Sequence, residues 1–163
     1  LQPMPGLSYH ESATETHLIY RGRDHAGFTM PDRELTQRDF LEAAFSVRNY
    51  MHFDDTYRLG RVTARATVGS MEAQEILILA GHYVGFLPAH RGEVWQSRGR
   101  MRAVKPNDWS LVSRFYASHD RRRDGESLRR AFMNELVRTP SRRGQDAAAP
   151  PRAALAEAPD RAR

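Results

Sequence analysis

Short apolar runs alternate with segments of helical character along most of the chain. Runs in which apolar side chains alternate with polar ones, or follow one another without interruption, predict strands. The predicted strands lie at residues 17–21, 45–50, 61–68, 83–87, 101–104 and 110–117. The run at 83–87 is almost entirely apolar and ends at Pro88, which is typical of a strand covered on both faces.

Capping residues mark where helices begin and end between these strands. Thr36, with Asp39 three residues later, resembles a capping box for a short helix through about Ala44. Ser70 is expected to cap the next helix, and Gly81 stands where a helix end favours glycine. Further helices are predicted at 71–80, 89–98 and 126–137. Strands that alternate with helices predict an α/β domain with a largely parallel sheet.

The composition changes at Thr139, where Ala, Pro, Arg and Ser begin to dominate. Repeated prolines interrupt any long helix or strand there, so we predict a disordered tail over 139–163. Residues 1–138 have the length of one domain. No apolar run approaches the roughly 18 residues that span a bilayer, and no signal-peptide pattern opens the chain. We therefore expect a soluble, cytoplasmic chain without membrane contact.

The formal net charge of +5 raises the question of nucleic acid binding. Apart from Lys105, the basic residues are arginines, and acidic residues are spread among them. The tightest basic clusters are short, at 121–123 and 142–143. We interpret the charge as a solvated, Arg-rich surface and not as a phosphate-binding face.

The histidines and carboxylates show no recognisable catalytic or metal-binding pattern. His10 and His17 are seven residues apart in a segment without helical periodicity, and no ligand spacing recurs elsewhere. Asp54 and Asp55, near His52, are interpreted as turn residues and not as an acid–base pair. The chain has no cysteine, which excludes disulfides and thiolate metal sites. We predict no catalytic residue, no metal and no cofactor.

Two short motifs could be taken for catalytic or nucleotide-binding elements, but the residues around them do not fit either kind of site. Ser70 lacks the Gly-x-Ser-x-Gly setting of a hydrolase nucleophile. Gly81 and Gly85 follow a helix and enter a strand, which is the reverse of the order in a dinucleotide-binding loop. Neither motif supports an enzyme.

The carboxyl end of the predicted strand 45–50 and the loop that follows it carry the best candidates for ligand binding. In open α/β sheets, ligands bind beyond the carboxyl ends of strands. Arg48 offers a bidentate partner for a carboxylate, and Tyr50 and Phe53 offer apolar walls. The candidate residues are Arg48, Asn49, Tyr50, Met51, His52 and Phe53. The alternative is that the two aromatic residues belong to the core and that Arg48 is solvated.

Several linked segments of this chain resemble the effector-binding domain of LysR-type transcription regulators. The main one, residues 61–88, has the order strand, capped helix, Gly, apolar strand and Leu-Pro, and contains the sequence Ala-Gly-His-Tyr-Val-Gly-Phe-Leu-Pro at 80–88. Residues 23–41 resemble the turn and short helix of the family, and residues 99–118 resemble its closing strand pair. Ala26 and Tyr83 stand where the family commonly has Pro and Gly.

The resemblance implies a fold and a domain organisation. The fold is that of a type 2 periplasmic-binding-protein-like lobe, with a mixed, mostly parallel sheet flanked by helices. Residues 17–106 would form the second lobe, and residues 7–16 and 110–138 would be remnants of the first. Family members begin with a winged helix-turn-helix, a linker helix and half of the first lobe, so we expect the chain to be a fragment.

The resemblance also implies a function. A small-molecule effector would bind between two lobes, against the loop after Arg48 and against the returning strand near Phe115. Promoter DNA would be contacted only through the N-terminal domain that this chain lacks. The alternative is a solute-binding protein of similar fold that delivers its ligand to a transporter.

Assembly is the last implication. In the family, strand 61–68 and helix 71–80 would pack against a partner subunit in a homodimer or homotetramer. The run Ile76, Leu77, Ile78 and Leu79 covers more of the helix circumference than one buried face needs. The alternative is that all four side chains belong to the core.

Overall fold

The computed structural model describes residues 3–49, 63–123 and 125–138. The candidates Tyr50, Met51, His52 and Phe53 and the predicted tail at 139–163 lie outside these residues. The strands are β1 (Leu7–Gly22), β2 (Phe45–Arg48), β3 (Ala64–Val68), β4 (Val84–Pro88), β5 (Met101–Val104) and β6 (Ser110–Asp120). The helices are η1 (Asp32–Glu34), α1 (Gln37–Glu42), α3 (Met71–Leu79), α4 (Ala89–Ser97), η2 (Arg121–Arg123) and α5 (Ser127–Arg138).

The strands form one mixed sheet in the order β3-β2-β4-β1-β5, and β6 pairs with β1 outside this path. The expected mixed α/β sheet is confirmed, but its parallel part is smaller than predicted. Parallel pairing joins β2 to β3 and β2 to β4, whereas β1 runs antiparallel to β4, β5 and β6. The central strand β1 therefore enters the sheet on the side where the carboxyl ends of the parallel strands lie.

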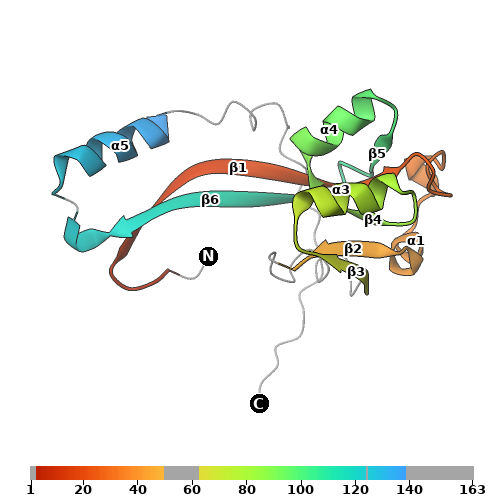
Figure 1. Cartoon of the computed structure of the whole chain (residues 1–163), viewed down its shortest axis with the longest axis horizontal. Coiled ribbons are helices and arrows are strands. Elements are labelled where there is room, and N and C mark those ends of the chain that lie inside the picture. Colours follow the sequence, from red (N-terminus) through yellow and green to blue (C-terminus); the bar gives the residue numbers. More distant parts are fainter. Residues whose placement is uncertain (1–2, 50–62, 124, 139–163) are drawn as a thin grey trace, which may run out of the picture.

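The core lies on both faces of the sheet because successive strand residues point in opposite directions. On one face, Tyr20, Leu87 and Met101 pack with Ile78 of α3 and are almost fully buried. On the other, Ile19 and Phe86 pack with Phe40 of α1 in a second buried cluster. Helices thus cover both faces of this part of the sheet (Figure 1).

The predicted helix boundaries are confirmed by specific hydrogen bonds. The Thr36 backbone N–H and hydroxyl both donate to Asp39 Oδ2, at 2.7 and 2.6 Å, at the start of α1. The Ser70 hydroxyl accepts from the Ala73 N–H at 3.1 Å at the start of α3. Gly81 has φ +79°, the left-handed conformation that commonly ends a helix.

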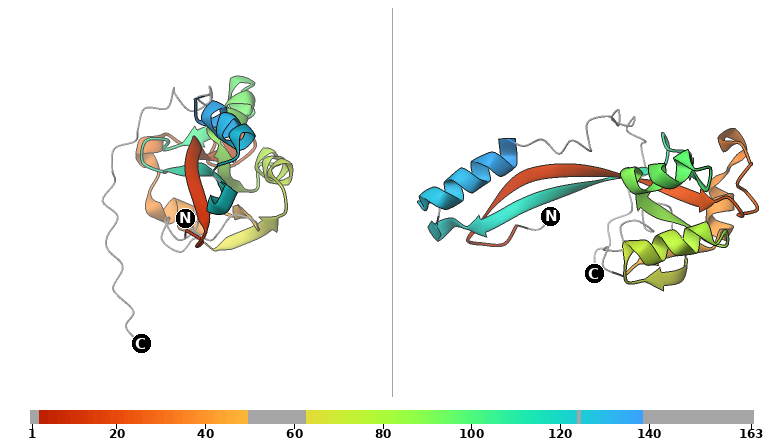
Figure 2. Two further views of the ribbon diagram at one scale, coloured as in Figure 1. Left: turned by 90° about the vertical axis from the view of Figure 1, so that its left-hand side faces the viewer. Right: turned by 45° about the horizontal axis from the view of Figure 1, so that its top comes forward.

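The part of β1 from Leu7 to Leu18 pairs with β6, and the two strands form a ribbon that projects from the rest of the fold (Figures 1 and 2). The register runs from Leu7 opposite Asp120 to Leu18 opposite Ser110. Helix α5 lies near the far end of this ribbon, and its Leu128 and Phe132 are 82% and 63% exposed. Among the described helices, none is long and apolar enough to cross a membrane.

Candidate functional site

The carboxyl ends of the parallel strands meet at one edge of the sheet. β2 ends at Arg48, β3 ends at Val68, and β4 ends at Pro88. Helices α3 and α4 begin directly after β3 and β4, so their N-termini also lie at this edge. The exposed backbone N–H groups of helix N-termini favour negative charge. We call this region the carboxyl edge.

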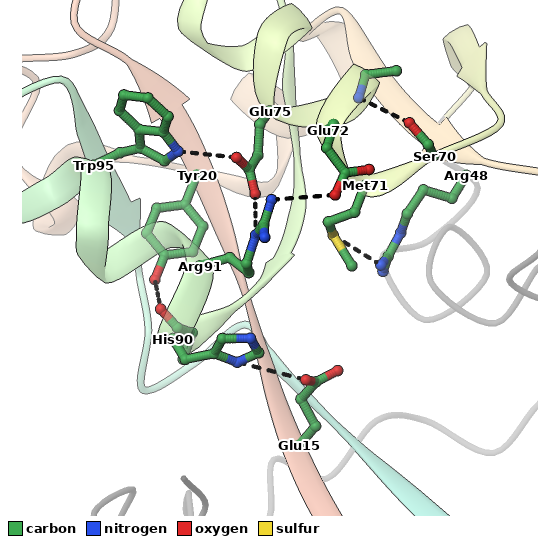
Figure 3. Close-up of polar contacts among 12 residues, drawn as sticks. Glu15, Tyr20, Arg48, Ser70, Met71, Glu72, Glu75, His90, Arg91 and Trp95 are labelled. Carbon is green, nitrogen blue, oxygen red and sulfur yellow. Dashed lines mark hydrogen bonds and ion pairs between the residues drawn. The ribbon is translucent and has the colours of Figure 1, made fainter.

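Arg48 lies at the carboxyl edge and is only 4% exposed, so the structure does not support the alternative of a solvated side chain. Its Nη1 is 3.3 Å from Met71 Sδ at the start of α3 (Figure 3). Its Nη2 is 3.4 Å from His17 Nδ1 on β1. The guanidinium is therefore held between a helix start and the strand that leads into the ribbon.

His17 is 2% exposed, and burial lowers its pKa to about 4, with further lowering by the nearby Arg48 and His90. The imidazole is therefore neutral near pH 7. A guanidinium can only donate, so His17 Nδ1 accepts from Arg48 and Nε2 carries the hydrogen. His17 Nε2 lies 3.1 Å from Glu15 Oε2 without the alignment of a hydrogen bond.

Glu15 connects the ribbon with α4. Its Oε1 lies 3.5 Å from His90 Nδ1, in the first turn of α4 (Figure 3). Arg48, His17, Glu15 and His90 thus form a continuous chain of polar contacts from β2 across β1 to α4. Any ligand that binds Arg48 contacts a group coupled to both the ribbon and a helix.

The depressed pKa of His17 predicts a pH dependence of stability. In the unfolded chain His17 has a pKa near the ordinary value of about 6.5, so between pH 4 and 6.5 the unfolded state binds the extra proton. The free energy of unfolding should therefore rise with pH across this window, by roughly 3 kcal/mol, and level off above it. Urea unfolding from pH 4.5 to 7.5 measures the slope.

Replacing His17 with Gln should flatten this slope, because the titrating group is removed. His82 is exposed, so His82→Gln serves as the control and should leave the slope as in the parent chain. An unchanged slope in His17→Gln would show that another group titrates.

A second polar network fixes α4 against α3 beside the carboxyl edge. Arg91 Nε donates to Glu75 Oε1 at 2.5 Å, and Trp95 Nε1 donates to Glu75 Oε2 at 3.1 Å (Figure 3). Arg91 also lies 3.4 Å from Glu72. The hydrogen bond with Glu75 raises the pKa of Arg91. Because Arg91 follows His90 directly, this network also sets the position of His90.

The remaining described candidates for ligand binding, Asn49 and Phe115, are exposed and do not belong to the chain of polar contacts that begins at Arg48. Asn49 is exposed, and its backbone N–H donates to the Val68 carbonyl at 2.9 Å. Phe115 is 49% exposed and lies opposite Ala13 in the ribbon. Ala13 precedes His17 by four residues, which is about 13 Å along a strand. Phe115 therefore lies farther out along the ribbon than the groups that contact Arg48.

The sequence did not predict that Arg48 contacts Met71 and His17, or that Glu15 and His90 extend this chain of contacts. Their separation along the chain hides this relation, because only the pairing of β2 with β3 and β4, and of β4 with β1, brings them together. The depressed pKa of His17 also depends on burial that follows from this pairing. Within the described ranges, no group of three or more His, Asp or Glu side chains is placed to hold a metal ion.

The structure also corrects one residue of the predicted oligomer interface. Ile78 is 0% exposed and belongs to the core with Tyr20, Leu87 and Met101, because it points from α3 directly onto the sheet. Ile76 is 66% exposed on the opposite side of the helix, and Leu77 and Leu79 are partly buried. Ile76 is therefore the member of the run that is available to a partner.

Comparisons with known proteins agree with this architecture. The profile described as "LysR substrate binding domain" matches residues 2–140. The HTH-type transcriptional activator BauR of Pseudomonas aeruginosa is 27% identical over 107 residues, which cover 65% of this chain and 35% of BauR. This chain thus spans about a third of the length of that relative.

Two solved structures show the same fold. The regulatory domain of CcmR from Synechocystis PCC6803, in complex with 2-PG, has a TM-score of 0.65 at 16% identity, covering 86% of this chain and 73% of that one. Full-length LysG from Corynebacterium glutamicum, with bound effector Arg, has a TM-score of 0.60 at 21% identity, covering 84% of this chain and 47% of LysG. Because the family model matches a range that contains all the described residues, the chain belongs to the LysR substrate-binding domain family.

Proposed function

We propose that this chain is the effector-sensing part of a LysR-type transcription regulator and that a small metabolite with a carboxylate binds at the carboxyl edge. The observation that carries the proposal is the buried guanidinium of Arg48 at the edge where α3 and α4 begin. A buried cation and helix N-termini both favour an anionic group, and Arg binds a carboxylate with two parallel hydrogen bonds.

We assign residues 17–106 to the second lobe and residues 7–16 and 110–138 to the first. The ribbon of β1 and β6 then connects the lobes, and the contacts of Glu15 with His17 and His90 lie where the ribbon joins the second lobe. A ligand on Arg48 is expected to change these contacts and so shift the population of lobe arrangements. The effector bound to LysG and the 2-PG bound to CcmR provide family precedents for small ligands.

In the intact protein we expect this part to control contacts with promoter DNA that another part makes, in the cytoplasm. The relative BauR is an HTH-type transcriptional activator, which favours a regulator over a solute-binding protein. We propose a sensing role and no enzymatic one. Ligand binding, and the transmission of that binding between the lobes, explain the series of polar contacts that runs from Arg48 to His90.

We further propose that the intact protein is a homodimer or homotetramer that uses β3 and α3. Among the described strands, β3 is the last at one end of the sheet order, so no described strand pairs with its outer side and a partner strand could pair there. Ile76 adds an exposed apolar side chain on the adjoining helix. This combination supports the interface that the family resemblance implies.

Arg48→Gln tests the ligand site. We would screen amino acids and short-chain carboxylates for those that raise the melting temperature of the parent chain, and measure their affinity by calorimetry. Arg48→Gln should weaken binding by about 30-fold or more, because a buried charge pair is lost. Arg65→Gln, an exposed arginine on β3, is the matched control and should bind as the parent chain does.

Equal binding by Arg48→Gln and the parent chain would refute the site. If Arg48→Gln does not fold, the ring ¹⁵N signals of His17 and His90 in the parent chain provide the second readout. A carboxylate that stabilises the chain should shift both signals, and unchanged signals would refute binding at the carboxyl edge.

A further inference from the structure

A separate hollow of about 210 Å³ is lined by residues of the ribbon and of α5. Helix α5 lies near the far end of the ribbon (Figures 1 and 2). Ser8 and His10 of β1 and His119 of β6 line its strand side. Ser8 pairs directly with His119, so His10 is the diagonal neighbour of His119. The two histidine Nε2 atoms lie 3.2 Å apart, and the rings are within 13° of parallel.

The hydrogen-bond partners assign the hydrogens of this histidine pair. His119 Nδ1 lies 3.3 Å from the carbonyl oxygen of Asp120, which can only accept, so Nδ1 carries the hydrogen. In the neutral pair His119 Nε2 therefore accepts, and His10 Nε2–H donates to it.

The helix side of the hollow adds positive charge and an apolar wall. Arg129 and Arg130 supply two guanidinium groups, Asn134 supplies an amide, and Met133 supplies the apolar surface. Arg129 also pairs with Glu126, which lies outside the lining, whereas no ion pair joins Arg130 to an acidic side chain among the described residues. Among the described residues that line the hollow, none is acidic.

We propose that this hollow binds a small organic anion that carries a carboxylate or phosphate group, at a site distinct from the carboxyl edge. The guanidinium groups complement the negative charge, and Met133 packs against the carbon part of the ligand. The histidine pair lines the strand side of the hollow, so its ring signals report binding there.

Imidazole ¹H–¹⁵N spectra of the whole chain test this proposal with succinate and phosphate as probes, against chloride at equal ionic strength. Saturable shifts of the His10 and His119 signals are expected at millimolar succinate or phosphate. Arg130→Gln should weaken binding about tenfold, because one charge-assisted hydrogen bond is lost. Arg100→Gln, an exposed arginine far from the hollow in sequence, should leave it unchanged.

Three results would overturn the proposal. The first is equal anion affinity in Arg130→Gln and the parent chain, which would show that Arg130 does not bind the anion, or an equal loss of affinity in Arg130→Gln and Arg100→Gln, which would indicate a general effect of charge. Shifts that saturate with Ni²⁺ but with neither anion would make the histidine pair a cation site instead. The absence of saturable shifts with both anions would exclude anion binding here, while leaving carboxylate binding at Arg48 to its own test.

Discussion

Replacing Ile78 with Asp should unfold the lobe. Ile78 is fully buried between α3 and the sheet, in contact with the cluster of Tyr20, Leu87 and Met101. The substitution removes a large apolar side chain from the core and leaves a carboxylate there without a partner. We expect a loss of at least about 4 kcal/mol in the free energy of unfolding, measured by urea denaturation, which is comparable to the whole stability of a small domain.

Ile76→Asp is the matched control on the same helix. Ile76 is 66% exposed, so the same substitution should change the free energy of unfolding by no more than about 1 kcal/mol. In the intact protein, Ile76→Asp should also dissociate the assembly if α3 contributes to the interface, as sedimentation would show. A folded Ile78→Asp variant would contradict the position of α3, and an unchanged oligomer in Ile76→Asp would contradict the interface.

Replacing Gly92 with Ala should displace α4 from the sheet. A Cβ atom at Gly92 would lie only 2.0 Å from Cζ of Tyr20, and the Tyr20 ring is fully buried and has no room to withdraw. Alanine favours a helix over glycine by about 1 kcal/mol, but overpacking of this kind costs more. We expect a net loss of roughly 2 kcal/mol in the free energy of unfolding.

The same substitution should weaken ligand binding at the carboxyl edge, because α4 carries His90 and Arg91. Gly69→Ala is the control, since no atom of the described residues lies within 4 Å of a Cβ atom at Gly69. Calorimetry and urea unfolding of both variants check the two effects. A Gly92→Ala variant as stable as the parent chain would show that α4 does not pack on Tyr20 in this way.

Local signals predicted most elements of this fold, because they depend on residues that are close in sequence. The helix start at Ser70 and the glycine after α3 are examples, and both are confirmed by the structure. The extension of β1 back to Leu7 was not predicted. Residues 7–16 are mostly polar, and they form a strand because β6 supplies their backbone partners. Strand direction was also predicted poorly, because it depends on pairing between distant segments.

The candidate site could be predicted only in part for the same reason. Arg48 was found because a strand end in an α/β sheet is a good place for a ligand. Glu15, His17 and His90 were not found, since no sequence spacing relates them to Arg48. Ile78 was assigned to the wrong surface because four consecutive apolar residues do not reveal which one faces the sheet. The structure resolves this through the packing of α3 on Tyr20 and Leu87.

The gene sequence upstream of the codon for Leu1 tests most directly whether the chain is the sensing part of a LysR-type regulator. We expect the same reading frame to encode, in order, a winged helix-turn-helix, a linker helix and the first half of the first lobe. A secretion signal peptide at the start of that frame, without a helix-turn-helix, would contradict the regulator and indicate a solute-binding protein of the same fold.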